Sequence, residues 1–199
     1  HDTVRRQRQM CIRDRDRSGL IKHWSDLVIK QSNKQQIFVK QYSGNKVWKE
    51  SESGKNIKSL SNKEKVETEE NTFFISTKNH HRVAWHPSTL WVGIGCERNT
   101  SAEFIEDCLN KLLSKCELSS SSIAGLATVD IKKDEKALID ISNAKNWPIK
   151  FFKNEELHTV DVPNPSKIVF KEIGTFSVAE AASLLACGNE GGHLLIEKN

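Results

Sequence analysis

The sequence predicts an α/β fold with a mostly parallel sheet that is covered by helices on both faces. From residue 90 onwards, short apolar runs alternate with stretches of helical periodicity, as in sheets built from strands and crossover helices. The second observation is the segment 90–101, Leu-Trp-Val-Gly-Ile-Gly-Cys-Glu-Arg-Asn-Thr-Ser. It indicates a buried strand that ends in a Gly-x-Gly turn and feeds a helix. Such a junction directs backbone N–H groups and the positive end of a helix dipole at an anion.

After residue 89, the apolar runs predict strands and the amphipathic stretches predict helices. In the first helix, apolar residues recur at i, i+3 and i+4 spacing from Phe104 to Leu113 and form one stripe. Strands are predicted at 90–96, 123–129, 148–152, 168–172 and 193–197. Helices are predicted at 100–116, 134–146, 154–158 and 177–187.

Residues 18–84 carry weaker signals. Trp24, Leu27 and Val28 have helical spacing. Short strands are predicted at 37–39, 47–48 and 73–75. Residues 49–71 are almost wholly Lys, Glu, Ser and Asn, so we expect a solvated, disordered linker there.

The first residues differ in character from the rest. The string Met10-Cys11-Ile12-Arg13-Asp14-Arg15 resembles the translation of a transposase adapter used in sequencing libraries. This predicts that residues 1–17 are an artefactual, disordered tail and that the remainder is an internal piece of a longer reading frame. The alternative is a genuine basic arm, Arg5, Arg6 and Arg8, that contacts phosphates.

Charge and composition exclude several classes of protein. The net charge is +4, but residues 1–89 hold 18 Lys and Arg against 10 Asp and Glu, and residues 90–199 hold 12 against 16. The basic character therefore lies outside the main domain and does not indicate nucleic-acid binding. No run of eighteen apolar residues and no signal-peptide pattern occurs, so we expect a cytoplasmic protein without a membrane partner.

The residues that commonly bind metals do not form a metal motif. The five cysteines contain no C-x-x-C pair, which favours free thiols over a zinc site. His80, His81 and His86 lack the spacing of a helical metal motif and are expected at the surface. Cys96 lies at a strand end before a helix start, where a thiolate is stabilised. Without a local histidine, however, a small buried thiol is favoured.

Two charged segments follow predicted strands. Gly93-x-Gly95-x-x-Arg98 lacks the third glycine of the dinucleotide fingerprint, which argues against a nicotinamide or flavin cofactor and against an unrelated nucleotide-binding module. Arg98 is a candidate for binding a carboxylate or phosphate; the alternative is an exposed arginine paired with Glu97. Asp130, Lys132 and Glu135 follow strand 123–129, at the edge where parallel sheets bind ligands. The alternative there is a charged loop that caps the next helix.

Two helix starts have the S/T-x-x-E pattern of a capping box, Thr100 to Glu103 and Ser177 to Glu180. The pattern predicts a capping role for Glu103. For Glu180 it leaves two interpretations open, a cap or a functional carboxylate.

Several blocks between Trp85 and Lys198 carry a family resemblance. They are His86-Pro87, 90–101, 124–132 with Glu135, Phe151-Phe152, Val-Pro-Asn-Pro-Ser at 162–166 and Gly-Thr-Phe-Ser-Val-Ala-Glu-Ala-Ala at 174–182. In this order they resemble the C-terminal domain of the cobalamin-biosynthesis CbiG family, shared with the small CobE proteins. The start Gly-Ile-Gly-Cys-Glu-Arg-Asn-Thr-Ser resembles the versions fused ahead of a precorrin-3B methyltransferase.

The resemblance implies a three-layer α/β/α domain at 85–199, with 18–84 as a remnant of the preceding CbiG region. It implies the corrinoid-binding domain of a cobalt-precorrin-5A hydrolase, which opens a δ-lactone and releases acetaldehyde. Since the family's N-terminal domain and any methyltransferase motif are missing from the sequence, we expect this piece alone to be inactive. The alternative is a non-catalytic precorrin carrier, fused to or partnering a precorrin-3B methyltransferase. Cobalt is expected only as part of the substrate, and no cofactor is expected.

The resemblance also implies a site for precorrin carboxylates at strand ends and helix N-termini. Because acidic residues outnumber basic ones after residue 89, binding must depend on local groups and not on the overall field. The expected catalytic residues are Glu180 and Glu135. The expected substrate-binding residues are Gly93, Gly95, Arg98, Thr100, Asp130, Lys132 and Ser177.

Overall fold

The computed structural model describes residues 17–50, 56–61, 63–64, 69–80, 82–188 and 192–197. The chain divides into two compact units, His1–Thr89 with Leu113–Ser122 and Leu90–Leu112 with Ile123–Asn199. Residues 1–16 of the predicted tail lie outside the described residues. In the described part of the chain, no helix is both long and apolar enough to cross a membrane.

A five-stranded sheet in the order β1-β5-β4-β2-β3 forms the first unit. Its strands are β1 (Arg17–Ser18), β2 (Ile37–Gln41), β3 (Ile57–Leu60), β4 (Thr72–Ile75) and β5 (Ala84–Trp85). The β1–β5 pair is antiparallel and the other pairs are parallel. Helix α2 (Ile21–Ser32) buries Leu27 against Ile37 and Val83. The predicted helix and the strands at 37–39 and 73–75 are confirmed.

Two predictions for this unit are wrong. Residues 47–48 belong to a 3-10 helix, η1 (Val47–Glu50), and not to a strand. The Gln41 side chain stabilises this compact loop. It accepts the Trp48 indole N–H at 2.8 Å and donates to the Asn45 carbonyl at 2.8 Å. Within the polar stretch 49–71, β3 pairs in parallel with β2, and η3 (Glu69–Asn71) precedes β4. An edge strand needs backbone hydrogen bonds more than apolar side chains, so composition did not reveal β3. Residues 51–55, 62 and 65–68 lie outside the described residues.

His86 is buried, not at the surface as predicted. Its exposed fraction is 1%, its Nδ1 lies 2.8 Å from the Ser76 carbonyl oxygen, and its Nε2 lies 2.9 Å from Ser18 Oγ. The ring therefore links β1 to the end of β4, and these two partners satisfy its polar atoms. His80 is half-buried and stacks on Phe74 with ring centroids 4.6 Å apart. His81 lies outside the described residues.

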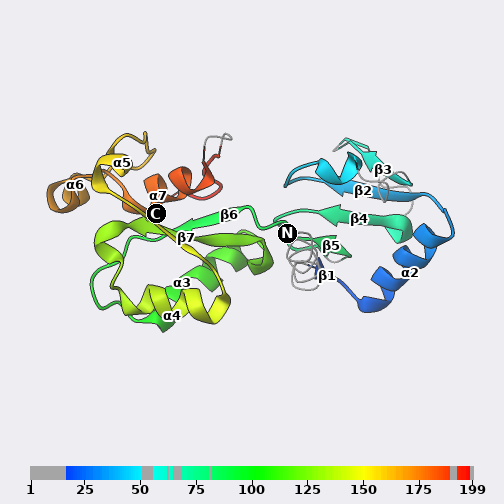
Figure 1. Cartoon of the computed structure of the whole chain (residues 1–199), viewed down its shortest axis with the longest axis horizontal. Helices are drawn as coiled ribbons and strands as arrows, with labels where there is room; N and C mark the ends of the chain where they lie inside the picture. Colours follow the sequence, from blue (N-terminus) through cyan, green and yellow to red (C-terminus); the bar gives the residue numbers. More distant parts are fainter. Residues whose placement is uncertain are drawn as a thin grey trace, which may run out of the picture. The chain divides into compact units, whose positions relative to one another are not determined.

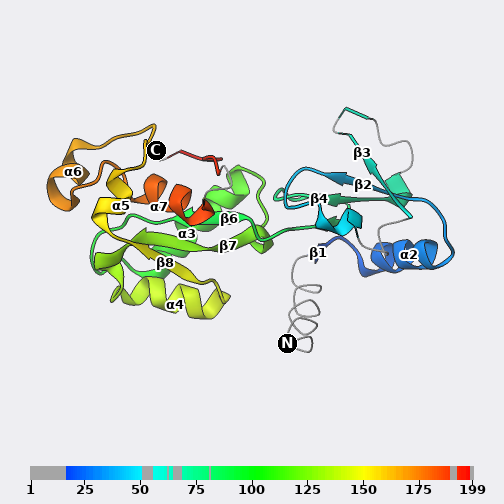
Figure 2. The ribbon, with the colours of Figure 1, turned by 45° about the horizontal axis from the view of Figure 1, so that its top comes forward.

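The second unit is a three-layer α/β/α domain, as predicted (Figures 1 and 2). Its sheet has the parallel order β6-β7-β8, with β6 (Leu90–Gly93), β7 (Ile123–Val129) and β8 (Ile149–Phe152). Helices α3 (Ala102–Lys115) and α4 (Lys136–Lys145) cover one face, and α7 (Val178–Cys187) covers the other. Helices α5 (Asn154–His158) and α6 (Lys167–Ile173) lie beyond the carboxyl ends of the strands. Two 3-10 turns flank β7, η4 (Ser120–Ser122) and η5 (Asp130–Lys132).

Strand β7 is buried on both faces, which explains its continuous apolar sequence. Leu126 packs with Leu138 and Ile141 on the α3 and α4 side. Ala127 and Val129 pack against the alanines of α7 on the other side. Because those alanines, Ala181, Ala182 and Ala186, have small side chains, α7 lies close to the sheet.

Two of the strands predicted in this unit do not form. Residues 168–172 lie in helix α6, which starts where Ser166 Oγ accepts the Val169 N–H at 3.4 Å and ends at Gly174, with φ at +79°. The apolar run Ile168-Val169-Phe170 does not distinguish a strand from a short helix. The cap at Ser166 and the glycine at 174 favour the helix. The described residues 192–197 include no strand, and Glu197 instead accepts a hydrogen bond from Asn164 at 3.1 Å.

Candidate functional site

The Gly-x-Gly segment at the end of β6 packs along the first turn of α7, without the predicted tight turn. A Cβ atom on Gly93 would overlap the Ala179 carbonyl, with the carbonyl carbon at 2.7 Å. A Cβ atom on Gly95 would lie 3.6 Å from Val178 Cβ, which is an ordinary contact. Gly93 is therefore required for the close approach of strand and helix. The two glycines bring the end of β6 to the N-terminus of α7.

Helix α7 begins without a side-chain cap, so the hydrogen bond that the capping pattern predicts to the Ser177 side chain does not form. Ser177 is at the N-cap position and its side chain makes no capping hydrogen bond. Its Oγ is buried and has no hydrogen-bond partner among the described residues, and the residue is 1% exposed. The first N–H groups of a helix have no partner within the helix. A buried hydroxyl and uncapped amides therefore meet at this helix start.

Glu180, in the first turn of α7, is 3% exposed. Its Oε1 accepts a hydrogen bond from Asn164 Nδ2 at 3.0 Å, and the same amide donates to Glu197. Asn164 lies between Pro163 and Pro165, which restrict the backbone of this loop. A tertiary contact with another loop thus helps to position this carboxylate. Sequence reasoning did not identify Asn164, although the Pro-Asn-Pro block was available as a signal.

Lys132 and Glu135 form a buried ion pair after β7. Lys132 Nζ lies 3.4 Å from Glu135 Oε2, and the side chains are 7% and 5% exposed. Glu135 Oε1 also accepts the backbone N–H of Asn99 at 3.1 Å. Asn99 has φ at +61°, a left-handed conformation that asparagine tolerates better than most residues. Glu135 is the residue before α4 but makes no capping hydrogen bond, so it joins the loops after β6 and β7 instead.

Arg98 makes a second, exposed link between the same two loops. Its Nη1 donates to Asp134 Oδ1 at 2.6 Å, and its Nη2 donates to the Ile131 carbonyl at 2.6 Å. The hydrogen bond from Arg98 holds the pKa of the Asp134 carboxyl below its usual range. Arg98 pairs with Asp134, so the alternative pairing with Glu97 is wrong.

The start of α3 also differs from the predicted capping box. Ser101, not Thr100, caps the helix, because its Oγ accepts the Phe104 N–H at 3.2 Å. The Thr100 hydroxyl donates to the Glu97 carbonyl at 2.9 Å, and Glu103 is exposed. Asp130 is half-buried at the start of η5.

Cys96 is half-buried and packs at the edge of the cluster around Leu126. Burial raises the pKa of its thiol, and the nearby Lys132 charge opposes that effect only in part. The thiol is therefore the form favoured at neutral pH, in agreement with the interpretation as a small buried residue. Among the described residues, no group of three or more His, Cys, Asp or Glu could hold a metal ion.

We expect Glu135→Gln to lower the free energy of unfolding by about 2–3 kcal/mol, because the buried Lys132 charge would lose its counter-charge. Urea unfolding followed by circular dichroism measures this loss. Asp134→Asn is the matched control, since it breaks an exposed ion pair in the same loop, and its effect should be much smaller. Equal losses for the two variants would contradict the assigned importance of the buried pair.

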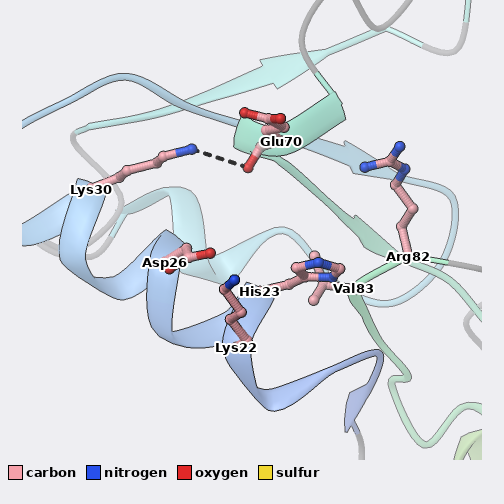
Figure 3. A pocket seen from close by; sticks show the side chains of 7 residues that line it. All are labelled: Lys22, His23, Asp26, Lys30, Glu70, Arg82 and Val83. Atoms are coloured by element: carbon pink, nitrogen blue, oxygen red, sulfur yellow. Dashed lines mark hydrogen bonds between the residues drawn. The ribbon is translucent and has the colours of Figure 1, made fainter.

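A pocket of about 310 Å³ lies in the first unit (Figure 3). It is lined by Lys22, His23, Asp26, Lys30, Glu70, Arg82 and Val83. Lys30 Nζ donates to the Glu70 carbonyl at 3.4 Å across one side. None of the residues predicted to form a site lines this pocket; all of them belong to the second unit.

The structure sorts most of the predicted residues into two groups, one at the start of α7 and one in the loops after β6 and β7. Gly93 and Gly95 contact the α7 start, where Ser177 and Glu180 lie. Arg98, Lys132 and Glu135 connect the loops after β6 and β7. Thr100 makes a local hydrogen bond and Asp130 begins η5.

Residues 90–199 match the family described as "Cobalamin synthesis G C-terminus". The cobalt-precorrin-5A hydrolase of Priestia megaterium is 33% identical over 117 residues, which are 59% of this chain and 31% of the relative. Protein CobE of a Sinorhizobium species is 30% identical over 111 residues, 55% of this chain and 71% of the relative. The crystal structure of CobE, a protein from the cobalamin (vitamin B12) biosynthetic pathway, matches with a TM-score of 0.52 and 36% identity, over 57% of this chain and 83% of that one. The chain thus spans about a third of the length of the hydrolase it matches.

Proposed function

The chain belongs to the cobalamin synthesis G C-terminus family, and from this membership we propose that its second unit binds the carboxylates of a cobalt-precorrin. In the complete protein, the unit would take part in opening the δ-lactone of cobalt-precorrin-5A and releasing acetaldehyde. The hydrolase relatives support this proposal by their names and their identity to this chain. Cobalt enters this chemistry as part of the substrate.

One observation carries the proposal: a buried carboxylate, oriented by an amide, lies in the first turn of an uncapped helix. Glu180 is held by Asn164, and the Ser177 hydroxyl beside it is buried with no hydrogen-bond partner among the described residues. Uncapped N–H groups at a helix start favour a carboxylate or a developing oxyanion. A positioned carboxylate is suited to general acid–base chemistry.

The groups at this helix start suit the hydrolysis of a lactone. Glu180 would accept a proton from water as the water oxygen attacks the lactone carbonyl. When the ring C–O bond breaks, the same proton would go to the leaving alkoxide. The helix N–H groups would stabilise the oxyanion between these steps. Glu135 has a positioning role in this scheme, because Lys132 and Asn99 occupy both of its oxygens.

Among the remaining predicted residues, Ser177 and Arg98 would bind the carboxylates at the rim of the macrocycle. Ser177 would donate its free hydroxyl, and Arg98 is about half exposed and retains further N–H donors. Lys132 would add positive charge below the loop surface. Gly93 and Gly95 let the strand end approach the helix start, and Thr100 and Asp130 would shape the rim of the site.

A second function, that of a non-catalytic precorrin carrier, is favoured by one observation. The chain covers 71% of CobE, so that relative consists largely of this one domain. A domain that occurs without the rest of the hydrolase would bind a precorrin and pass it to another enzyme, such as a fused or partner precorrin-3B methyltransferase.

Titration with dicyanocobyrinic acid, a cobalt corrinoid with seven carboxylates, tests the binding site. Ser177→Ala should weaken binding about tenfold, because a hydrogen bond to a charged group is lost. Arg98→Ala should reduce the binding free energy by about 1.5–3 kcal/mol for the same reason. Ser183→Ala is the matched control, since Ser183 lies on α7 and bonds to the Glu180 carbonyl. No binding by the unsubstituted chain, or equal loss with the control, would contradict the site.

Acetaldehyde release separates the two functions. The complete protein should release acetaldehyde from cobalt-precorrin-5A if it is a hydrolase. Tight corrinoid binding without acetaldehyde release would support the carrier.

A further inference from the structure

Three aromatic side chains form an exposed cluster beyond the carboxyl ends of the strands. Phe170 and Phe176 stack with ring centroids 4.5 Å apart and an angle of 20° between the rings. His158 lies 5.7 Å from the first ring and 5.9 Å from the second. Phe170 is 41% exposed and Phe176 is 37% exposed. We call these three residues the aromatic cluster.

Core packing does not account for the aromatic cluster. Helix α6 already packs against the α7 side of the core through Val169 and Ile173, which leaves Phe170 on its outer side. Phenylalanine is among the residues most often buried, so two adjacent exposed rings call for an explanation.

The local backbone holds the aromatic cluster in place. Ser166 caps the start of α6, and its backbone N–H donates to the Phe176 carbonyl at 2.8 Å. This hydrogen bond closes the segment that carries both phenylalanines. His158 comes from α5, beside the same segment. The rings are therefore preorganised and do not belong to a free loop.

The aromatic cluster adjoins the start of α7. Phe176 directly precedes Ser177, whose buried hydroxyl has no hydrogen-bond partner among the described residues. Helices α5 and α6 lie beyond the strand ends in both views (Figures 1 and 2). Val169 and Ile173 of α6 pack against the core cluster that contains Val178, the first residue of α7. An apolar aromatic surface and a set of hydrogen-bond donors thus lie side by side.

We propose that the aromatic cluster is the platform on which the macrocycle of a polycarboxylate corrinoid packs, while its rim carboxylates reach the start of α7. This inference rests on the proposed function, which places those carboxylates at Ser177. A corrinoid has an apolar ring face and an acidic rim, and the juxtaposition of rings and donors matches both parts. Binding sites of this kind combine aromatic walls with a few placed polar groups. A small carboxylate without a ring would bind at the start of α7 and make no use of the aromatic cluster.

Binding of dicyanocobyrinic acid to the Phe176→Leu and Phe170→Leu variants tests the platform. Cyanide occupies both axial positions of the cobalt in this probe, so affinity reports ring and carboxylate contacts and not ligation by His158. Each substitution should weaken binding about 5- to 10-fold, as expected for the loss of one aromatic contact. Phe176→Tyr keeps the ring and should retain the affinity.

Two controls separate the platform from general effects. Ile168→Ala removes an apolar side chain of α6 that is 74% exposed and lies outside the aromatic cluster, and it should leave affinity unchanged. Tricarballylate, a tricarboxylate without a ring, should bind the unsubstituted chain and the phenylalanine variants equally. Thermal midpoints should stay close to that of the unsubstituted chain, because the substituted rings are exposed.

Each other result overturns the inference. Unchanged corrinoid affinity in both leucine variants would remove the platform but leave the carboxylate site and the proposed function standing. The same result with a loss of self-association would assign the aromatic cluster to a protein contact instead. If the leucine variants also bind tricarballylate more weakly by the same factor, the rings affect the carboxylate site at the start of α7 and do not contact the macrocycle. No corrinoid binding by the unsubstituted chain would overturn the proposed function as well.

Discussion

Gly93→Ala should lower the free energy of unfolding of the second unit by about 4–5 kcal/mol, near the upper end for a single substitution. The new Cβ atom would overlap the carbonyl of Ala179, and neither atom belongs to a flexible side chain. Helix α7 would have to move away from β6, and the alanines that pack on Ala127 would lose their contacts. Because a domain is stable by only about 5–15 kcal/mol, the variant should be close to unfolding at room temperature.

Gly95→Ala is the matched control for this prediction. It adds the same methyl group two residues later, where the nearest atom is Val178 Cβ at 3.6 Å. We expect a change of less than about 1 kcal/mol. Urea unfolding followed by circular dichroism, with hydrogen exchange of the α7 amides, compares the two variants. If Gly93→Ala is as stable as Gly95→Ala, α7 does not approach the strand as described.

Glu180→Gln should reduce acetaldehyde release by the complete protein by about 10²- to 10⁴-fold, the range for loss of a general acid–base group. Folding should change little, because the glutamine carbonyl can still accept the Asn164 hydrogen bond. The substitution therefore removes the proton-accepting oxygen and keeps the shape of the side chain. Acetaldehyde assays with cobalt-precorrin-5A and thermal unfolding of the same preparation measure the two effects together.

The control for this experiment is Glu103→Gln, which changes an exposed glutamate in the first turn of α3. It should alter neither turnover nor the thermal midpoint. Unchanged turnover in Glu180→Gln would remove Glu180 from the chemistry. A loss of turnover together with a large fall in the thermal midpoint would show that Glu180 supports the fold and not the reaction.

Local patterns in the sequence were sufficient for the main elements of the second unit. The apolar run of β7 and the stripe of α3 follow from side-chain periodicity, which depends on the residues of one element. The blocks around Gly93 and Glu180 were sufficient to place the chain in its family. Such motifs are short runs of consecutive residues, so they can be identified without the structure. Segments with a short apolar run were assigned wrongly, as α6 and η1 show, since their periodicity fits more than one structure.

The partners of the site residues were decided by the tertiary structure. Glu180 bonds to Asn164, 16 residues away, and Arg98 bonds to Asp134, 36 residues away. A capping-box pattern describes contacts within one helical turn, so it cannot show that a side chain from a distant loop also supplies a partner. The sequence by itself thus determined the fold class, the family and the residues worth testing. Packing of α7 against the end of β6 decided which of them lie together, because the free energy of such contacts depends on atoms that meet only after the chain has folded.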